Sequence, residues 1–246
     1  MGISKERVSE KKFIPSWVKF GHKALYDFSA RYVKDKKVLD CACGEGFGSK
    51  VFIQAGASLV IGVDIDSSAV EIAAAKANSP LASFMRGSAT NLPFPDSEFD
   101  VYISIETIEH IKDERSFLKE AFRVIRPGGL FICSTPNRKV LNPGKKITDK
   151  PINIFHVREY SKDEFCLILK AVFKDVSLFG VIRHSELKTD ILNKIGAILP
   201  NNYAARMSQI IKLPKLAFDD KKKYIVEETS PDYHHEMFLA VCHKEK

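Results

Sequence analysis

A glycine-rich turn behind a short apolar run constrains this chain more than any other feature. In residues 37–50, KVLDCACGEGFGSK, the apolar run ends in Asp40, and Gly44, Gly46 and Gly48 follow on alternate positions. An apolar run of this kind suits a buried parallel strand. Glycine lets the backbone turn sharply and approach a ligand where a Cβ would clash. The pattern predicts a strand, a ligand-binding turn, and a helix that begins near Phe47.

Two classes of nucleotide site use such a turn. In dinucleotide folds it directs helix N–H groups at a pyrophosphate. Here Asp40 and Glu45 bring two carboxylates to the loop, which repel a pyrophosphate and attract an ammonium or sulfonium group. Ser49 also stands where GxGxxG spacing requires its third glycine. The charges favour a cationic ligand, although the turn by itself leaves an NAD-linked oxidoreductase open.

A second strand is predicted at residues 59–66, LVIGVDID, and it ends in acidic residues. Asp64 follows Gly44 by twenty positions, where a carboxylate can accept both hydroxyl protons of a ribose. The alternative is that the acidic residues only cap the next helix. The pattern favours ribose binding by Asp64 and capping by Asp66 or Ser67.

The composition is that of one soluble domain. A chain of 246 residues with 45% hydrophobic and 28% charged residues is long enough for one large α/β domain with a full core, or for one domain plus a lid. No apolar run approaches the length of a membrane span, and the N-terminus lacks a signal-peptide core. We therefore expect residues 1–246 to form a single domain in the cytoplasm, without a membrane span.

The net charge of +7 comes partly from lysine clusters. Such clusters usually form solvent-exposed surfaces, and the alternative is that they attract an anionic substrate. No nucleic-acid motif accompanies them, so we expect no nucleic-acid partner. Cys41 and Cys43 are not spaced as a CxxC pair, and His234, His235 and His243 are poorly spaced for ligands on a strand. The sequence predicts no metal site.

Five segments in order carry a family resemblance. VLDCACGEGFG, VIGVDID, GSATNLPFPDSEFDVYIS, IETIEHI and RVIRPGGLFICSTPN together resemble the class I methyltransferases that depend on S-adenosyl-L-methionine. The resemblance covers roughly residues 22–180. It implies an α/β fold: a three-layer, Rossmann-like sheet of seven strands, mostly parallel with an antiparallel terminal strand. It also implies an N-terminal helical cap, residues 13–33. Residues 190–207 have helical spacing, so we interpret residues 182–236 as a helical lid or oligomer surface, compatible with a homodimer.

The resemblance assigns cofactor contacts to the ends of the first four strands. In the family, an aspartate usually follows the glycine of the adenine loop, and Ser88 stands there instead, so a serine hydroxyl or a water would bind the exocyclic amine. His22 or Tyr26 of the helical cap could touch the cofactor or only pack against it. The implied cofactor residues are Asp40, Cys41, Gly44, Gly46, Asp64, Ile65, Ser88, Ala89 and Ile105.

Two histidines are the candidate bases. His110 follows the fourth strand, at the sheet edge where open α/β folds bind ligands, and its alternative is a structural role at a helix start. His156 lies in FHVREY, a segment similar to one in glycan, lipopolysaccharide and capsule methyltransferases; its alternative is to orient the loop. The same interpretation assigns Glu106, Arg158 and Tyr160 to substrate binding, although Arg158 could form only a surface ion pair with Glu159.

The predicted reaction is O-methylation of a sugar, a nucleotide-linked sugar or a glycan. A sugar hydroxyl needs a base as the new bond forms, whereas a phosphate or carboxylate oxygen needs none. The alternative enzyme acts on a small metabolite or on a quinone or lipid precursor, with an apolar pocket. Two rivals lie outside this class: a cofactor-binding assembly partner that has lost activity, and the NAD-linked oxidoreductase.

Overall fold

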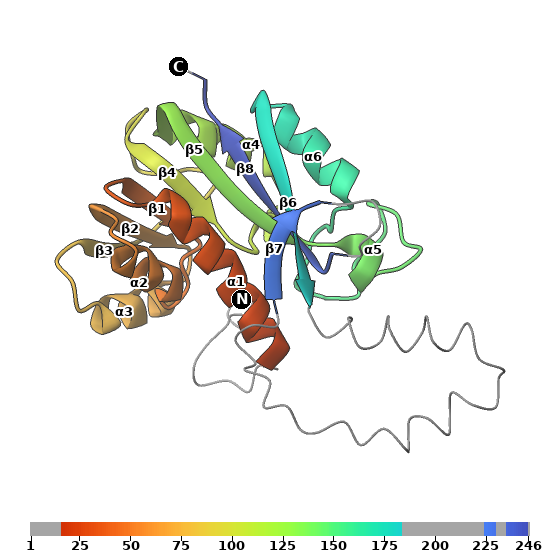
Figure 1. Ribbon diagram of the computed structural model, residues 1–246, viewed down its shortest axis with the longest axis horizontal. Coiled ribbons are helices and arrows are strands. Elements are labelled where there is room, and N and C mark those ends of the chain that lie inside the picture. Colours follow the sequence, from red (N-terminus) through yellow and green to blue (C-terminus); the bar gives the residue numbers. More distant parts are fainter. Residues whose placement is uncertain (1–15, 184–223, 230–234, 246) are drawn as a thin grey trace.

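One sheet of eight strands organises the protein (Figure 1). The computed structural model describes residues 16–183, 224–229 and 235–245. The strand order is β3-β2-β1-β4-β5-β8-β6-β7. The strands are β1 (Lys37–Cys41), β2 (Leu59–Asp64), β3 (Ala82–Arg86), β4 (Phe99–Ser104), β5 (Ile125–Pro136), β6 (Asp175–Arg183), β7 (Tyr224–Glu228) and β8 (Met237–His243).

Strands β1 to β5 run parallel, and β8 enters between β5 and β6 in the opposite direction. In register, Leu39 lies beside Ile61 on one side and Tyr102 on the other. The carboxyl ends of β1, β2 and β4 therefore meet at one edge of the sheet. This confirms the mostly parallel sheet with an antiparallel terminal strand.

The number of strands differs from the prediction. Residues 224–228 form β7, which pairs antiparallel with β6 and extends the predicted seven-stranded sheet at its edge. Residues 182–236 are thus not wholly a helical insertion, since β6 also runs to Arg183. A five-residue edge strand beside a lysine cluster is too short for its alternation to stand out in the sequence. The predicted helix at 190–207 lies outside the described residues.

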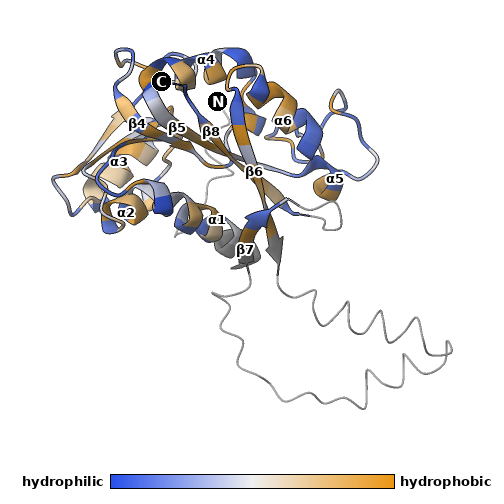
Figure 2. Ribbon diagram, turned by 45° about the horizontal axis from the view of Figure 1, so that its top comes forward, coloured by the Kyte–Doolittle hydropathy of each residue, from blue (hydrophilic) through white to orange (hydrophobic). Residues whose placement is uncertain are grey.

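Helices cover both faces of the sheet, which makes the three predicted layers. In Figure 2, α1 and α2 lie on one side of the sheet, and α4 and α6 lie on the other. No helix in the described part of the chain is long and apolar enough to cross a membrane. The helices are α1 (Ser16–Ser29), α2 (Phe47–Gln54), α3 (Ser67–Lys76), α4 (Glu114–Val124), α5 (Arg138–Leu141) and α6 (Lys162–Lys170), with 3-10 turns at Ala30–Tyr32 and Ile108–His110.

Alternating side chains along the strands build two cores. Leu39 and Tyr102 point to the face covered by α4 and α6, while Val38 and Val101 point to the face covered by α1 and α2. Because both faces of the sheet are buried, the sequences of the strands are nearly continuous apolar runs. Polar residues with a binding role can then stand only where strands end.

Local sequence signals fix several helix ends. Asp66 accepts a hydrogen bond from the Ser68 N–H at 2.8 Å, which confirms its role as the cap of α3. Ser161 and Glu164 form the predicted capping box of α6, each side chain accepting from the other's backbone N–H. These caps are local interactions, and this is why the sequence predicts them well.

Candidate functional site

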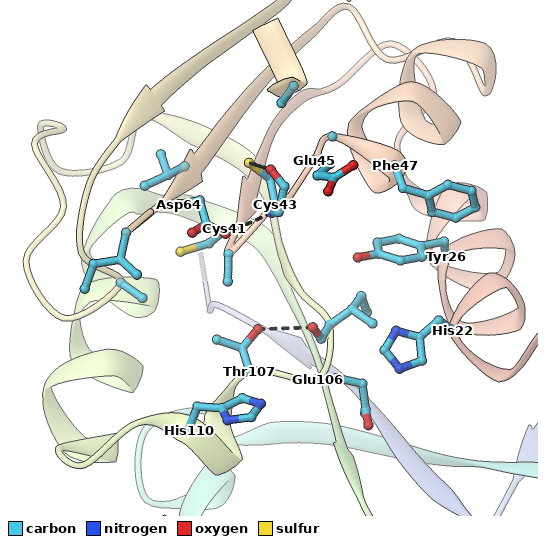
Figure 3. A pocket seen from close by; sticks show the side chains of 18 of the residues that line it. His22, Tyr26, Cys41, Cys43, Glu45, Phe47, Asp64, Glu106, Thr107 and His110 are labelled. Atoms are coloured by element: carbon cyan, nitrogen blue, oxygen red, sulfur yellow. Dashed lines mark hydrogen bonds between the residues drawn. The ribbon is translucent and has the colours of Figure 1, made fainter. Parts of the chain in front are cut away.

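A cavity of about 2000 Å³ opens at the carboxyl ends of β1, β2 and β4. Its walls come from the glycine turn, helix α1, the loop after β3, the turn after β4, and residues 153–156. Ligand pockets typically measure about 300–1,000 Å³, so this cavity has room for a nucleoside and a second molecule. Figure 3 shows Cys43, Glu45 and Asp64 at one end, and Glu106 and His110 at the other.

The glycine turn owes its shape to left-handed backbone. Gly44 has φ +54° and Gly46 φ +82°, a region that L side chains rarely adopt. Gly48 is required for another reason: a Cβ there would lie 2.3 Å from Cε1 of Tyr26. The turn therefore brings bare backbone to the cavity and lets a tyrosine of α1 pack directly on it.

Asp64 holds the turn and faces the cavity. Its Oδ2 accepts from the Gly44 N–H at 2.9 Å, and its Oδ1 accepts from the Asp66 N–H at 2.9 Å. Each carboxylate oxygen has a second lone pair, so these bonds leave Asp64 able to accept from a ligand hydroxyl. The structure thus places Asp64, the predicted ribose ligand, beside the glycine turn and on the cavity wall.

Asp40 lies beneath the turn and does not line the cavity. Its Oδ2 accepts from the Ser49 hydroxyl at 2.6 Å, which ties β1 to α2. Burial raises the pKa of Asp40 from 3.8 to about 6. Glu45 does line the cavity, but its carboxylate pairs with the Lys76 ammonium at 2.9 Å. The acidic character of the site therefore comes less from Glu45 than the sequence suggested.

Helix α1 forms one wall. Tyr26 and Phe47 meet edge to face with ring centroids 5.4 Å apart, and the Tyr26 hydroxyl points into the pocket, with Phe47 and His22 on either side of it (Figure 3). Burial raises the pKa of Tyr26 well above 10.0, so its phenol stays protonated at neutral pH. On the facing side, Ser88 and Ala89 line the cavity, and the Ser88 and Thr90 hydroxyls lie 2.9 Å apart.

The end of β4 turns sharply into the cavity. Glu106 has φ +49°, a strained conformation for a residue with a Cβ. Two bonds to Ser134 on β5 hold it: the Glu106 N–H donates to Oγ at 2.8 Å, and Oγ donates to the Glu106 carboxylate at 2.7 Å. This turn places Glu106, Glu109 and His110 along the same wall.

His110 and His156 come together although 45 residues separate them. Their ring centroids are 4.9 Å apart with the planes at 79°. His110 Nδ1 lies 3.0 Å from the Phe155 carbonyl oxygen and donates to it, which leaves Nε2 as the acceptor nitrogen when the imidazole is neutral. Buried Glu109 joins them, with its Oε1 3.9 Å from His110 Nε2. One ligand atom from each of the three residues lies within 4.8 Å of the other two.

His156 is held at both nitrogens. Its Nδ1 donates to Glu159 Oε1 at 2.6 Å, and its Nε2 lies 2.9 Å from the Asn153 amide nitrogen. The Asn153 carbonyl oxygen accepts from the Phe155 N–H, so the amide nitrogen is the donor to His156. Contacts at both ring nitrogens thus orient His156, one of them to the buried carboxylate of Glu159.

Comparison with known proteins agrees with this geometry. Residues 39–133 match the family model described as "Methyltransferase domain". A probable S-adenosylmethionine-dependent methyltransferase of Mycobacterium tuberculosis H37Rv is 35% identical over 199 residues, which is 80% of this chain and 70% of the relative. The chain belongs to the S-adenosylmethionine-dependent methyltransferases.

Other relatives of the methyltransferase place it within that family. A probable S-adenosylmethionine-dependent methyltransferase of Mycolicibacterium smegmatis is 37% identical over 68% of this chain and 63% of its own length. A phthiotriol/phenolphthiotriol dimycocerosates methyltransferase of Mycobacterium ulcerans is 29% identical over 58% of this chain and 54% of its own. The chain spans about two thirds of the length of the first two relatives.

A solved structure supports the fold. The crystal structure of an S-adenosylmethionine-dependent methyltransferase of Thermotoga maritima, described as a possible histamine N-methyltransferase, superposes with a TM-score of 0.63. The two chains are 16% identical, and the match covers 94% of each. At this identity the comparison shows the methyltransferase's Rossmann-like fold and says nothing about its acceptor.

The methyltransferase brings most of the predicted site residues to one cavity. Asp40 instead lies beneath the glycine turn, and Arg158 pairs with Glu114 of α4 at 2.5 Å, not with Glu159. Tyr160 is completely buried in the core against Phe165, so it has no surface to offer a substrate. The predicted residues that line the cavity are Cys41, Gly44, Gly46, Asp64, Ile65, Ser88, Ala89, Ile105, Glu106, His110 and His156.

The sequence analysis does not predict Glu109, Asn153 and Glu159 as site residues. Glu109 is next to His110 in IEHI, and an adjacent glutamate and histidine at a strand end are a sequence signal for a functional pair. Asn153 and Glu159 flank His156 by three positions on each side. Their role depends on how the loop folds back on itself, and no periodicity reveals this.

Proposed function

We propose that this methyltransferase acts on a hydroxyl oxygen, and that the acceptor is a sugar, a nucleotide-linked sugar or a glycan. The observation that carries this proposal is that His110, with His156 beside it, lies at one end of the cavity, while Asp64 and the glycine turn lie at the other. A hydroxyl acceptor must lose a proton during transfer, and imidazoles flanked by carboxylates suit that task.

At the cofactor end, the proposed roles follow from the donors and acceptors present. Asp64 would accept from the ribose hydroxyls, and the bare turn at Gly44 and Gly46 would admit the cofactor's polar end. Ser88 and Ala89 would bind the adenine edge through a hydroxyl and a backbone N–H. S-adenosylmethionine supplies an electrophilic methyl group on a sulfonium, and the buried Asp40 carboxyl favours positive charge nearby when it is ionised.

At the acceptor end, the chain orients the hydroxyl and takes up its proton. Glu106 and the polar edge of Asn153 offer acceptors and donors for neighbouring hydroxyl groups. His110 presents Nε2 on the cavity side because its Nδ1 donates to Phe155. Alignment of the acceptor oxygen, and exclusion of water by Tyr26 and Phe47, supply the rest of the catalysis.

A lipid-type acceptor is the second candidate, and specific observations favour it. Two exposed apolar side chains line the cavity near the acceptor end, Leu141 at 40% and Ile154 at 75%, and Ile152 and Val157 of the same loop are exposed as well. The relative from Mycobacterium ulcerans is named for phthiotriol dimycocerosates, which are lipids. An acceptor with a terminal hydroxyl group and an apolar chain would suit a cavity whose acceptor end is polar and whose surroundings are apolar.

Calorimetry tests the cofactor assignment. We expect S-adenosylmethionine and S-adenosylhomocysteine to bind and NAD to give no heat. Asp64→Ala should abolish binding, while Glu71→Ala, which removes an exposed carboxylate of α3 outside the cavity, should not. Binding of NAD, or full affinity in Asp64→Ala, would refute the assignment.

An acceptor panel tests the reaction. Sugar nucleotides, phospho-sugars, quinols and long-chain diols should be assayed for methyl transfer with the full chain. We expect turnover with hydroxyl acceptors, reduced in His110→Ala and His156→Ala at nearly unchanged cofactor affinity. Turnover with amines alone, or unchanged turnover in both variants, would contradict the proposal. A preference for diols over sugars would select the lipid candidate.

A further inference from the structure

We propose that Glu109, His110 and His156 bind one divalent transition-metal ion at the acceptor end of the cavity, where it would hold the acceptor hydroxyl. The inference deepens the proposed O-methylation and rests on it for its role, but the site itself can be tested without any acceptor. It differs from the sequence analysis, which predicts no metal, and it replaces the base role proposed above for the two histidines, because a ring nitrogen that binds the ion cannot also take up the acceptor proton.

The three side chains already converge. Their ligand atoms lie within 4.8 Å of one another, in a part of the cavity wall formed by two distant segments. Ligands held about 2.0–2.2 Å from one ion lie about 3 to 4 Å apart, so closure needs a movement of only about 1 Å. All three line the cavity, and an ion there would be reachable by a ligand.

The surroundings of the imidazoles match those of metal-binding histidines. Such residues almost always donate one ring N–H to a carboxylate or a backbone carbonyl, which directs the other nitrogen at the ion. Here His156 Nδ1 donates to the Glu159 carboxylate at 2.6 Å, and His110 Nδ1 donates to the Phe155 carbonyl at 3.0 Å. Both rings therefore present Nε2 as the electron-pair donor.

Glu109 is fixed as the third ligand. Its backbone carbonyl accepts from the Val157 and Arg158 N–H groups at 2.7 and 3.2 Å, which joins the two ligand-bearing segments. The Thr135 hydroxyl donates to Oε2 at 3.1 Å, and Oε1 is the oxygen 3.9 Å from His110 Nε2. Glu106 adds a further carboxylate on the same wall.

Asn153 contacts the same nitrogen of His156 that the ion would bind. Its amide nitrogen lies 2.9 Å from His156 Nε2, on the nitrogen that the ion would take. Metal binding must displace this amide, so Asn153 competes with the ion. Removal of the Asn153 side chain should then strengthen metal binding, whereas a purely structural histidine pair gives no reason for metal to bind at all.

The ligand types indicate the class of ion. Two imidazoles and one carboxylate suit Zn²⁺, Mn²⁺ or Fe²⁺ better than Mg²⁺ or Ca²⁺, which prefer oxygen ligands. Three protein ligands leave positions open for the acceptor. The hydroxyl bound there would release its proton to solvent, because the ion stabilises the alkoxide. The alkoxide oxygen would then bond to the methyl carbon as the carbon–sulfur bond breaks, and the sulfonium becomes a neutral thioether.

The test is a titration of the chelator-stripped full chain with Mn²⁺ and with Zn²⁺, without cofactor or acceptor, followed by electron paramagnetic resonance and calorimetry. We expect one site per chain. His110→Ala and His156→Ala should lose it, and Glu159→Gln should weaken it by about 10- to 100-fold, as loss of a supporting hydrogen bond typically does. Asn153→Ala should bind more tightly. His243→Ala, outside the cavity, should bind like the wild type.

Several results would overturn the metal site: no stoichiometric binding, equal binding in His110→Ala and the wild type, or Asn153→Ala and Glu159→Gln both binding like the wild type. The last comparison holds even where an alanine variant of a histidine fails to fold. Methyl transfer that continues undiminished in a chelator would also refute it while leaving the O-methyltransferase proposal intact. Tight, variant-sensitive metal binding without hydroxyl methylation would uphold the site and refute the proposed acceptor.

Discussion

The buried carboxyl of Asp40 makes a quantitative prediction about stability and pH. Asp40 is 1% exposed, and its side chain accepts a hydrogen bond from Ser49. Burial is the main reason that its pKa rises from 3.8 to about 6, and the nearby charge of Asp64 adds to the rise. The folded protein therefore holds a proton on Asp40 at pH values where the unfolded chain has released it.

The sign and size of the effect follow from linkage. Below pH 3.8 both states are protonated and Asp40 costs nothing. As the pH rises towards 6, only the unfolded chain ionises, so the free energy of unfolding falls. Each pKa unit corresponds to about 1.36 kcal/mol, which gives a full cost of about 3 kcal/mol above pH 6. Between pH 5 and pH 8 the expected loss is about 1.4 kcal/mol.

Asp40→Asn should remove this dependence. We expect the free energy of unfolding of the variant, relative to the wild type, to increase by about 1.4 kcal/mol from pH 5 to pH 8. Urea denaturation of the ligand-free protein at both pH values measures the difference, and any packing change cancels in the comparison. Ser49→Ala should enlarge the wild-type dependence, because the lost hydrogen bond favours the ionised form.

If the free energy of unfolding changes equally between pH 5 and pH 8 in the wild type and in Asp40→Asn, the prediction is wrong, because Asp40 would then titrate alike in the folded and the unfolded chain. We also expect Asp40→Asn to bind S-adenosylmethionine more weakly at pH 8, because an ionised carboxyl near a cationic ligand is lost. A variant that is more stable but binds less would show that the buried carboxyl is kept for binding.

Three further predictions concern packing and capping. Gly48→Ala should cost about 1–3 kcal/mol in urea denaturation and weaken cofactor binding in calorimetry, because its Cβ would displace Tyr26; an unchanged denaturation midpoint would contradict this. Gly180→Ala should cost about 1–3 kcal/mol, since its Cβ would lie 1.9 Å from the His235 ring, and adding His235→Ala should recover part of the loss in a double-mutant cycle; strict additivity would exclude the clash. Ser161→Ala should cost about 1 kcal/mol by removing the cap of α6, measurable as a lower Tm, and an unchanged Tm would contradict the capping role.

The sequence was informative wherever a feature depends on neighbours in the chain. The strand and glycine turn at residues 37–50, the cap at Asp66 and the capping box at Ser161 follow from a few adjacent residues, and the structure contains all of them. The spacing of Asp64 from Gly44 also reveals the site, because a parallel sheet places successive strand ends at one edge. Family, fold class and cofactor all follow from such local segments.

Tertiary structure alone decided the rest. Tyr160 belongs to the core and Asp40 lies under the turn, although each is polar enough to suggest a ligand contact. His110 and His156 meet because the backbone of Glu109 bonds to the loop that carries His156, a contact between residues about 50 positions apart. Local patterns in the sequence do not reveal which loops are in contact, because that depends on how the two buried faces of the sheet pack. The acceptor end of this methyltransferase is therefore recognised only in the folded protein.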